Sequence, residues 1–244
     1  MKKNIIVTGS NRGIGKAIVE KFAKMQCNIW ACARTRNEEF EQYLSELSEQ
    51  NNIWIKPIYF ELTDPEAIKT GIKQIMSEKI NIDVLVNNAG INMYSLFQMT
   101  RLQDAKKLFE IDYFAPFQIM QLILKRMTKQ QFGCIINISS IAALDAHAGD
   151  AVYGSAKSAL LTLSKAVATE VGHMGIRVNV IAPGPVETDM IKTNMEKIGD
   201  QIVSNSIMDR LAQSSEIADV VYYLSSDEAS FVNGQVIRVD GGIK

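Results

Sequence analysis

Residues 4–15 read Asn-Ile-Ile-Val-Thr-Gly-Ser-Asn-Arg-Gly-Ile-Gly, a short apolar run followed at once by three glycines. The apolar run predicts a buried β-strand over residues 3–8, and a helical pattern begins at residue 13. Glycines between a strand and a helix permit a tight turn. They also let backbone N–H groups approach a pyrophosphate at the positive end of the helix dipole.

The spacing Gly9-x-x-x-Gly13-x-Gly15 differs from the commoner GxGxxG. By itself, a purely structural turn would explain it nearly as well as a nucleotide site. Its position directly after the first predicted strand favours the nucleotide site.

Short apolar runs alternate with helical patterns along the whole chain, which is typical of a parallel sheet covered by helices on both faces. Strands are predicted over 3–8, 28–33, 53–60, 82–87, 133–139, 175–182 and 234–239, and helices over 13–25, 37–50, 65–79, 101–127, 152–173 and 215–225. Asp64-Pro65 predicts a capped helix start, and Pro116 is expected to kink or split the fourth helix. No repeat or linker divides the chain, so residues 1–244 are predicted to form one α/β domain with a seven-stranded doubly wound sheet.

One long segment, residues 184–213, breaks this alternation because it mixes apolar and polar residues without a clear period. Loops of this length are commonly functional, so the segment is interpreted as a lid over the site. A surface excursion containing one short helix is the alternative.

Composition excludes several classes of function. Of the 244 residues 47% are hydrophobic and 22% charged, and the 26 basic residues are scattered over a chain of net charge −1. A nucleic-acid partner is therefore not expected. No apolar run is long enough to span a membrane, and three cysteines without a pairing pattern suit a reducing compartment, so a cytoplasmic protein is expected. Two histidines, neither near a cysteine, give little support for a metal site.

The end of the second predicted strand bears on the choice of nicotinamide cofactor. An acidic residue there would bind the ribose 2′-hydroxyl, whereas a basic residue accommodates a 2′-phosphate. The sequence reads Ala33-Arg34, and Arg12 in the glycine turn could supply a second guanidinium. NADP(H) is therefore expected in preference to NAD(H), although either arginine could instead be solvated.

Three residues suggest acid/base chemistry. Tyr153 and Lys157 lie four residues apart on one predicted helix, hence on one face, and Ser140 follows the end of the predicted strand 133–139. A neighbouring ammonium and an oxidised nicotinamide would favour the phenolate, which brings a proton donor closer to neutral pH. We expect Tyr153 to act as the acid/base, Ser140 to bind a carbonyl oxygen, and Lys157 to lower the pKa of Tyr153 and hold the nicotinamide ribose.

With the glycine turn, Asn87-Asn88-Ala89-Gly90, Ser140 and Tyr153-x-x-x-Lys157 together, the chain resembles a short-chain dehydrogenase/reductase from about residue 3 to Gly242. The resemblance implies a Rossmann-type sheet of order 3-2-1-4-5-6-7 and a homotetramer. It also implies cofactor contacts from five places: the glycine turn, the ends of the second and third predicted strands, the end of the fourth strand, the helix with Tyr153 and Lys157, and the segment after the sixth strand. These are Gly9, Ser10, Asn11, Arg12, Gly13, Ile14, Gly15, Arg34, Glu61, Leu62, Asn88, Ala89, Gly90, Tyr153, Lys157, Pro183, Gly184, Val186 and Thr188.

Within that family, at Glu187-Thr188-Asp189-Met190 and Arg210-Leu211-Ala212, the chain is most similar to the 3-oxoacyl-[acyl-carrier-protein] reductases of fatty acid biosynthesis. The resemblance therefore implies reduction of a 3-oxoacyl thioester; another small carbonyl or sugar substrate is the alternative. Asp112 replaces the family's catalytic asparagine, so the proton relay could persist in altered form or activity could be reduced, and a purely cofactor-binding role is conceivable. Gln131 and Met174 stand where carrier-binding reductases have basic residues, so an acyl carrier protein is a conditional partner for which Arg126 and Lys129 could substitute.

Overall fold

Seven parallel strands form one sheet in the order β3-β2-β1-β4-β5-β6-β7 in the computed structural model, which describes residues 2–188 and 206–243. The predicted count, direction and order are confirmed. The strands are β1 (Asn4–Thr8), β2 (Asn28–Ala33), β3 (Ile55–Tyr59), β4 (Val84–Asn87), β5 (Gly133–Ile138), β6 (Ile176–Pro183) and β7 (Val236–Val239). Each lies within two residues of its predicted bounds.

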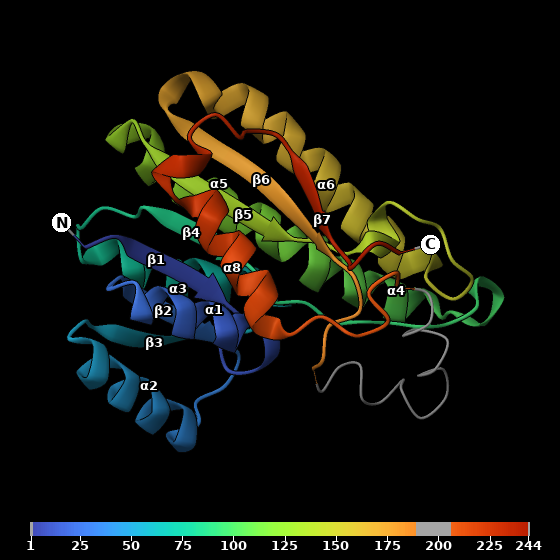
Figure 1. Ribbon diagram of the computed structural model, residues 1–244, viewed down its shortest axis with the longest axis horizontal. Coiled ribbons are helices and arrows are strands. Elements are labelled where there is room, and N and C mark those ends of the chain that lie inside the picture. The colour runs from blue at the N-terminus through green and yellow to red at the C-terminus, as the bar shows by residue number, and fades with distance from the viewer. Residues whose placement is uncertain (1, 189–205, 244) are drawn as a thin grey trace.

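Helices cover both faces of the sheet (Figure 1). The first core cluster joins the sheet to α1 (Gly13–Lys24), α2 (Glu38–Asn51) and α8 (Ser214–Ser225). The second joins the opposite face to α3 (Pro65–Ser77), α5 (Ala115–Gln130) and α6 (Ala151–Val171). Successive residues of one strand, such as Ile5 and Ile6, belong to different clusters, because neighbouring side chains of a strand point to opposite faces of the sheet.

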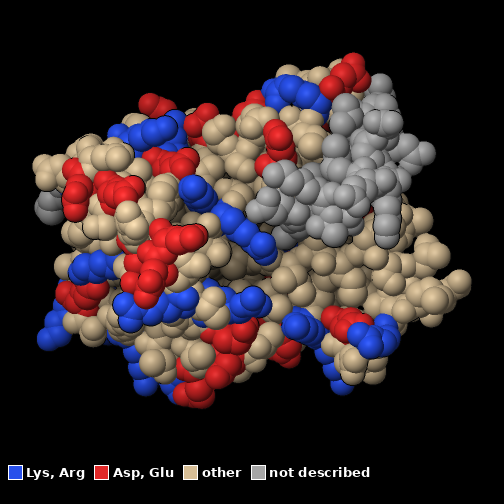
Figure 2. Space-filling view, turned by 90° about the horizontal axis from the view of Figure 1, so that it is seen from below, with Lys and Arg blue, Asp and Glu red and all other residues tan. Residues whose placement is uncertain are grey.

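The start of α3 agrees with the predicted helix cap. Asp64 Oδ1 accepts hydrogen bonds from the N–H groups of Glu66 and Ala67 at 2.9 and 3.1 Å, as expected for a cap before Pro65. Short 3₁₀ segments η1 (Phe97–Met99), η3 (Ile141–Ala143), η4 (Gly172–Met174) and η5 (Asp227–Ala229) occur in the connections. In the described residues no helix is long and apolar enough to cross a membrane. On the face that Figure 2 shows, basic and acidic side chains of the described residues are interspersed.

Pro116 splits the fourth helical run, as predicted, but through a widened turn. α4 (Leu102–Phe109) passes into a π-helical turn, η2 (Glu110–Phe114), before α5 begins. Proline has no N–H to close a bond to residue 112, and its ring crowds that carbonyl, so the chain inserts a wider turn. The turn carries Asp112.

The predicted lid lies only partly within the described residues. Its first five residues, 184–188, and its last eight, 206–213, are described, whereas residues 189–205 lie outside them. Val186 pairs with Ala212 in an isolated parallel bridge, so the two flanks of the segment lie side by side.

Candidate active site

A cavity of about 660 Å³ lies at the carboxyl ends of the central strands. It adjoins the switch point where β1 pairs with β2 on one side and β4 on the other, the position where open α/β sheets bind ligands. Of the residues predicted to touch cofactor or substrate, all line this cavity except Ser10 and Asp112. The elements therefore bring together side chains that are distant in sequence.

Ser10 is placed differently from the prediction. Its side chain is fully buried, and its Oγ donates a hydrogen bond to the carbonyl of Cys32 at 2.9 Å. Its backbone N–H bonds the same carbonyl at 3.1 Å. Ser10 thus ties the glycine turn to the end of β2 and faces away from the cavity.

The turn requires glycine at residues 9, 13 and 15, because of its backbone angles and its close contacts. Gly9 and Gly13 have φ of +65° and +52°, in the left-handed region. A Cβ on Gly15 would lie 2.0 Å from the carbonyl oxygen of Gly9 and 2.5 Å from Nδ2 of Asn88. A side chain at residue 15 would therefore disrupt the turn.

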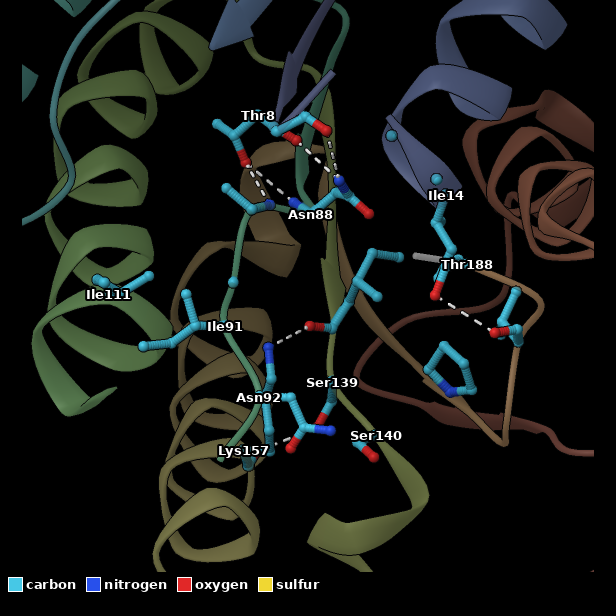
Figure 3. A pocket seen from close by; sticks show the side chains of 18 of the residues that line it. Thr8, Ile14, Asn88, Ile91, Asn92, Ile111, Ser139, Ser140, Lys157 and Thr188 are labelled. Carbon is cyan, nitrogen blue, oxygen red and sulfur yellow. Dashed lines mark hydrogen bonds between the residues drawn. The ribbon is translucent and has the colours of Figure 1, made fainter. Parts of the chain in front are cut away.

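Thr8 and Asn88 fasten the turn to the end of β4 (Figure 3). Thr8 Oγ1 accepts hydrogen bonds from the N–H groups of Asn88 and Ala89, both at 3.0 Å. Asn88 Nδ2 donates in return to the carbonyls of Thr8 and Gly9 at 3.0 and 3.1 Å. These paired contacts fix the two strand ends that border the cavity.

The first turn of α1 is open to a ligand. Its N-cap residue, Arg12, makes no capping hydrogen bond with its side chain, whereas the Asn37 side chain caps α2. The N–H groups at the start of α1 therefore remain available for an anion, and they adjoin glycines that line the cavity. The residues present fit a dinucleotide pyrophosphate.

Two arginines line the cavity, one in the glycine turn and one at the end of β2. Arg12 and Arg34 both line it, together with Thr35. Arg36, two residues further on, is instead paired with Glu41 at 3.0 Å and does not line the cavity. Arg12 and Arg34 are thus the cations placed to meet a phosphate.

At the other end of the cavity lie Ser140, Tyr153 and Lys157. Ser140 follows β5 and caps η3, its Oγ accepting from the N–H of Ala142 at 3.2 Å. Lys157 Nζ lies 5.9 Å from the ring centre of Tyr153, one helical turn earlier on α6. The structure brings these three predicted residues together.

Lys157 and Asp112 form a buried ion pair. Nζ of Lys157 lies 3.1 Å from Oδ2 of Asp112, and their side chains are 5% and 0% exposed. The same ammonium donates to the carbonyl of Ile138 at 3.2 Å, while Asp112 Oδ1 accepts from the N–H of Ile91 at 2.9 Å (Figure 3 shows the bond to Ile138). Asp112 stands behind the lysine and does not face the cavity.

The electrostatic environment of Tyr153 differs from the expectation. Burial raises the pKa of Tyr153; Lys157 acts to lower it, Asp112 to raise it, Ser140 to lower it through a hydrogen bond, and Asp150 to raise it. The net direction is upward, because burial outweighs the lowering by the ammonium and the Asp112 charge adds to the effect of burial. The phenol is held protonated, in the form that can donate a proton.

The pKa of Lys157 is also raised, but against the effect of burial. Burial acts to lower its pKa, but the charges of Asp112 and Tyr153 and the hydrogen bond to Asp112 raise it above the ordinary value. The lysine therefore remains an ammonium at neutral pH.

Further residues line the cavity that the sequence reasoning did not select. Asn92, Tyr94, His147 and Asp150 contribute polar groups, and Ile91, Ile141 and Ile243 contribute apolar ones. Asp150 directly precedes α6, and its position three residues before Tyr153 in the sequence was the available signal. No sequence pattern indicated Ile243.

Comparison with known proteins finds relatives over nearly the whole chain. The sequence model of the family described as enoyl-(acyl carrier protein) reductase matches residues 9–244. The 3-oxoacyl-[acyl-carrier-protein] reductase FabG of Escherichia coli (strain K12) is 34% identical over 241 residues, 99% of this chain and 97% of the relative. The solved structure of ElxO with NADP bound has 32% identity and a TM-score of 0.89, covering 99% of this chain and 98% of that one. Acetoin dehydrogenase YohF from Salmonella typhimurium has 30% identity and a TM-score of 0.89, covering 99% and 97%. The chain belongs to the short-chain dehydrogenase/reductase family, whose members are oxidoreductases that use nicotinamide cofactors.

Proposed function

We propose that the protein is an NADP(H)-dependent reductase of a ketone, with Tyr153 as its acid/base. The observation that carries the proposal is one continuous cavity that has Arg12 and Arg34 at one end and Ser140, Tyr153 and Lys157 at the other. Such a cavity suits an extended dinucleotide with its reactive end beside the phenol. When bound, the nicotinamide supplies or accepts the hydride.

The chain's own residues handle the oxygen of the substrate. Ser140 Oγ donates a hydrogen bond to the carbonyl oxygen and orients it. Tyr153 then donates its proton to that oxygen as negative charge develops on it, and in the reverse direction the phenolate removes the proton of the alcohol. The raised pKa of Tyr153 keeps the phenol neutral in the resting protein, which is the form that the reductive step requires.

Lys157 has two roles in this proposal. Its ammonium lowers the free energy of the phenolate that forms after proton transfer, and it holds the ribose next to the nicotinamide. Asp112 fixes the ammonium at 3.1 Å and compensates its charge in a buried site. Asp112 is therefore a positioning residue.

The preference for NADP(H) rests on Arg12 and Arg34. In Arg34→Ala, we expect KM for NADPH to rise roughly 10- to 100-fold, the loss of one or two hydrogen bonds to a charged group, with little change for NADH. Steady-state kinetics with both cofactors measures this. The matched control is Arg36→Ala, whose guanidinium pairs with Glu41; equal losses in both variants would contradict the assignment.

For the substrate, we propose a 3-oxoacyl thioester, supported by the relative from E. coli and by the apolar side chains Ile91, Ile141 and Ile243 along the cavity. Arg126 and Lys129 near the end of α5 supply basic charge for an acidic carrier. The second candidate is a small hydroxyketone, diketone or sugar, favoured by Asn92, Tyr94, His147 and Asp150 in the same cavity. Turnover of 3-oxoacyl thioesters, free and on a carrier protein, against acetoin, diacetyl and sugar ketones decides between them.

The pH dependence of an Asp112→Asn variant tests the role of Asp112 beside Tyr153 and Lys157. Because the Asp112 charge raises the pKa of both Tyr153 and Lys157, Asp112→Asn lowers both. Ketone reduction needs the protonated phenol. As pH rises, its rate should therefore begin to fall at a lower pH in the variant than in wild type. Alcohol oxidation needs the phenolate and should begin at lower pH.

The measurement for this variant is kcat/KM against pH in both directions. Asp104→Asn is the control, because Asp104 lies on α4 and pairs with Arg101 at 2.7 Å on the surface. A profile of Asp112→Asn that coincides with wild type would remove Asp112 from the acid/base system.

A homotetramer and a substrate lid over 184–213 complete the proposal. The assembly is supported by the family resemblance and by the exposed aromatic side chains Phe114 and Phe231, since large exposed apolar groups mark interfaces. Sedimentation equilibrium tests the tetramer.

A further inference from the structure

Arg238, on β7, contacts two carboxylates from separate parts of the chain. Nη1 and Nη2 donate to the two carboxylate oxygens of Asp145 at 3.2 and 2.8 Å. Nε donates to Oδ2 of Asp240 at 2.8 Å, and Nη2 also lies 2.7 Å from that oxygen. A guanidinium held by two carboxylates fixes their orientation as well as their distance, because its donors are coplanar. We refer to Asp145, Arg238 and Asp240 as the Arg238 bridge.

One end of the bridge holds the turn that carries Ser140. The carbonyl of Ile141 accepts hydrogen bonds from the N–H groups of Leu144 and Asp145, both at 2.8 Å, so Asp145 closes the turn that starts at Ser140. Through Asp145, the bridge ties the carbonyl-binding serine to the last strand of the sheet.

The opposite side of the same turn rests on α6. Ser158 Oγ donates to the carbonyl of Ala143 at 2.7 Å. A Cβ on Gly154 would lie 2.5 Å from the carbonyl of Ala142, so helix and turn are in close contact. The Ser140 turn is thus held between α6, which carries Tyr153, and Arg238.

The other end of the bridge holds the C-terminal turn. Asp240 Oδ1 accepts from the N–H of Gly242 at 3.1 Å, and both Gly241 and Gly242 have positive φ. A Cβ on Gly184 would lie 2.8 Å from the Cα of Asp240, so this turn also supports the chain after β6. The turn ends at Ile243, which lines the cavity.

The same turn anchors the end of the predicted lid segment. The carbonyls of Gly242 and Gly241 accept from the N–H groups of Ile207 and Met208 at 2.9 and 3.2 Å. Ser206, which is buried, donates through Oγ to the carbonyl of Gly241 at 3.1 Å. Asp240 therefore connects Arg238 to residues 206–208.

We propose that Arg238 is a positioning residue that holds the Ser140 turn in register with the C-terminal turn, whose Ile243 lines the cavity and whose other side anchors residues 206–208. The inference rests on the proposed function, because it assigns Ser140 to the substrate carbonyl. Arg238 itself does not line the cavity, so its effect passes through Asp145 and Asp240. The glycine turn that faces the cofactor has no contact with the bridge among those described above.

Arg238→Met tests the proposal, since it keeps an apolar side chain of similar length and removes all the donors. We expect kcat/KM for the ketone to fall roughly tenfold, because a substitution far from the reacting atoms that displaces Ser140 slows the reaction. The Kd for NADPH should be unchanged. Arg238→Lys, which restores the charge, should recover part of the loss, and Asp145→Asn should reproduce most of it.

Hydrogen–deuterium exchange supplies a readout that needs no substrate. In Arg238→Met, amides of residues 141–150 and 206–208 should exchange faster than in wild type, with those of residues 8–15 unchanged. Arg101→Met is the matched control, because it removes a two-donor pair with Asp104 at 2.7 and 3.1 Å elsewhere on the surface.

The outcomes separate this proposal from the proposed function. Wild-type protein that turns over no ketone would refute the function, whereas unchanged exchange in Arg238→Met would refute the bridge whatever the activity. Normal ketone kinetics in Arg238→Met, or losses equal to those of Arg101→Met, would also overturn it.

Discussion

Tyr153→Phe should lower kcat for ketone reduction roughly 10²- to 10⁴-fold, the usual contribution of a positioned general acid. The substitution removes only the phenol oxygen, and the ring stays packed on α6, one helical turn before Lys157. Binding of the cofactor should persist, because Lys157 and the glycine turn are unchanged. Steady-state kinetics together with a fluorescence titration of NADPH separates the two effects.

A control of the same chemical kind is available in Tyr43→Phe. The Tyr43 hydroxyl donates to Oε1 of Glu20 at 2.7 Å, and Tyr43 does not line the cavity. This variant should retain wild-type kcat. Retention of kcat in Tyr153→Phe would instead refute the acid/base role and the proposed mechanism with it.

Lys157→Met should have the largest effect on stability. It leaves the fully buried Asp112 carboxylate without its counter-ion, and breaking a buried pair in this way costs about 3–5 kcal/mol of unfolding free energy. The deficit comes from an uncompensated charge in a site without water access, so it should exceed that of any surface substitution considered above.

Urea unfolding of wild type and variant at neutral pH measures this deficit. The double variant Lys157→Met/Asp112→Asn removes the stranded charge and should recover most of the unfolding free energy without recovering activity. A double variant no more stable than Lys157→Met would show that the loss comes from packing and not from the charge.

The fold could be predicted from the sequence because its signals are local. Apolar runs such as Ile5–Val7, the cap at Asp64 and the break at Pro116 each act over a few residues, and all three are found where expected. Residues close to one another in a motif, such as Tyr153 and Lys157, could also be placed together, since the helix fixes their relative positions.

Other features depend on tertiary contacts that no local pattern encodes. Ser10 belongs to the glycine motif, yet its direction is set by the carbonyl of Cys32 on another strand. The net direction of the pKa of Tyr153 depends on burial and on Asp112, which is why the expected lowering by Lys157 does not prevail. Arg238 and Asp145 are 93 residues apart in sequence, and neither stands in a recognisable motif.

The widened turn at Glu110–Phe114 lets the outward face of α4 and the inward direction of Asp112 be set independently. A regular helix would fix one relative to the other. In an α-helix each residue advances the rotation by about 100°, so the faces of successive segments are locked together. A turn of larger circumference adds an angular offset between α4 and α5, while Ile111 and Asp112 are turned inward. Substitutions that reshape the outer surface of α4 can therefore accumulate without rotating the carboxylate away from Lys157, so this part of the surface can diverge while the proton-handling group is preserved.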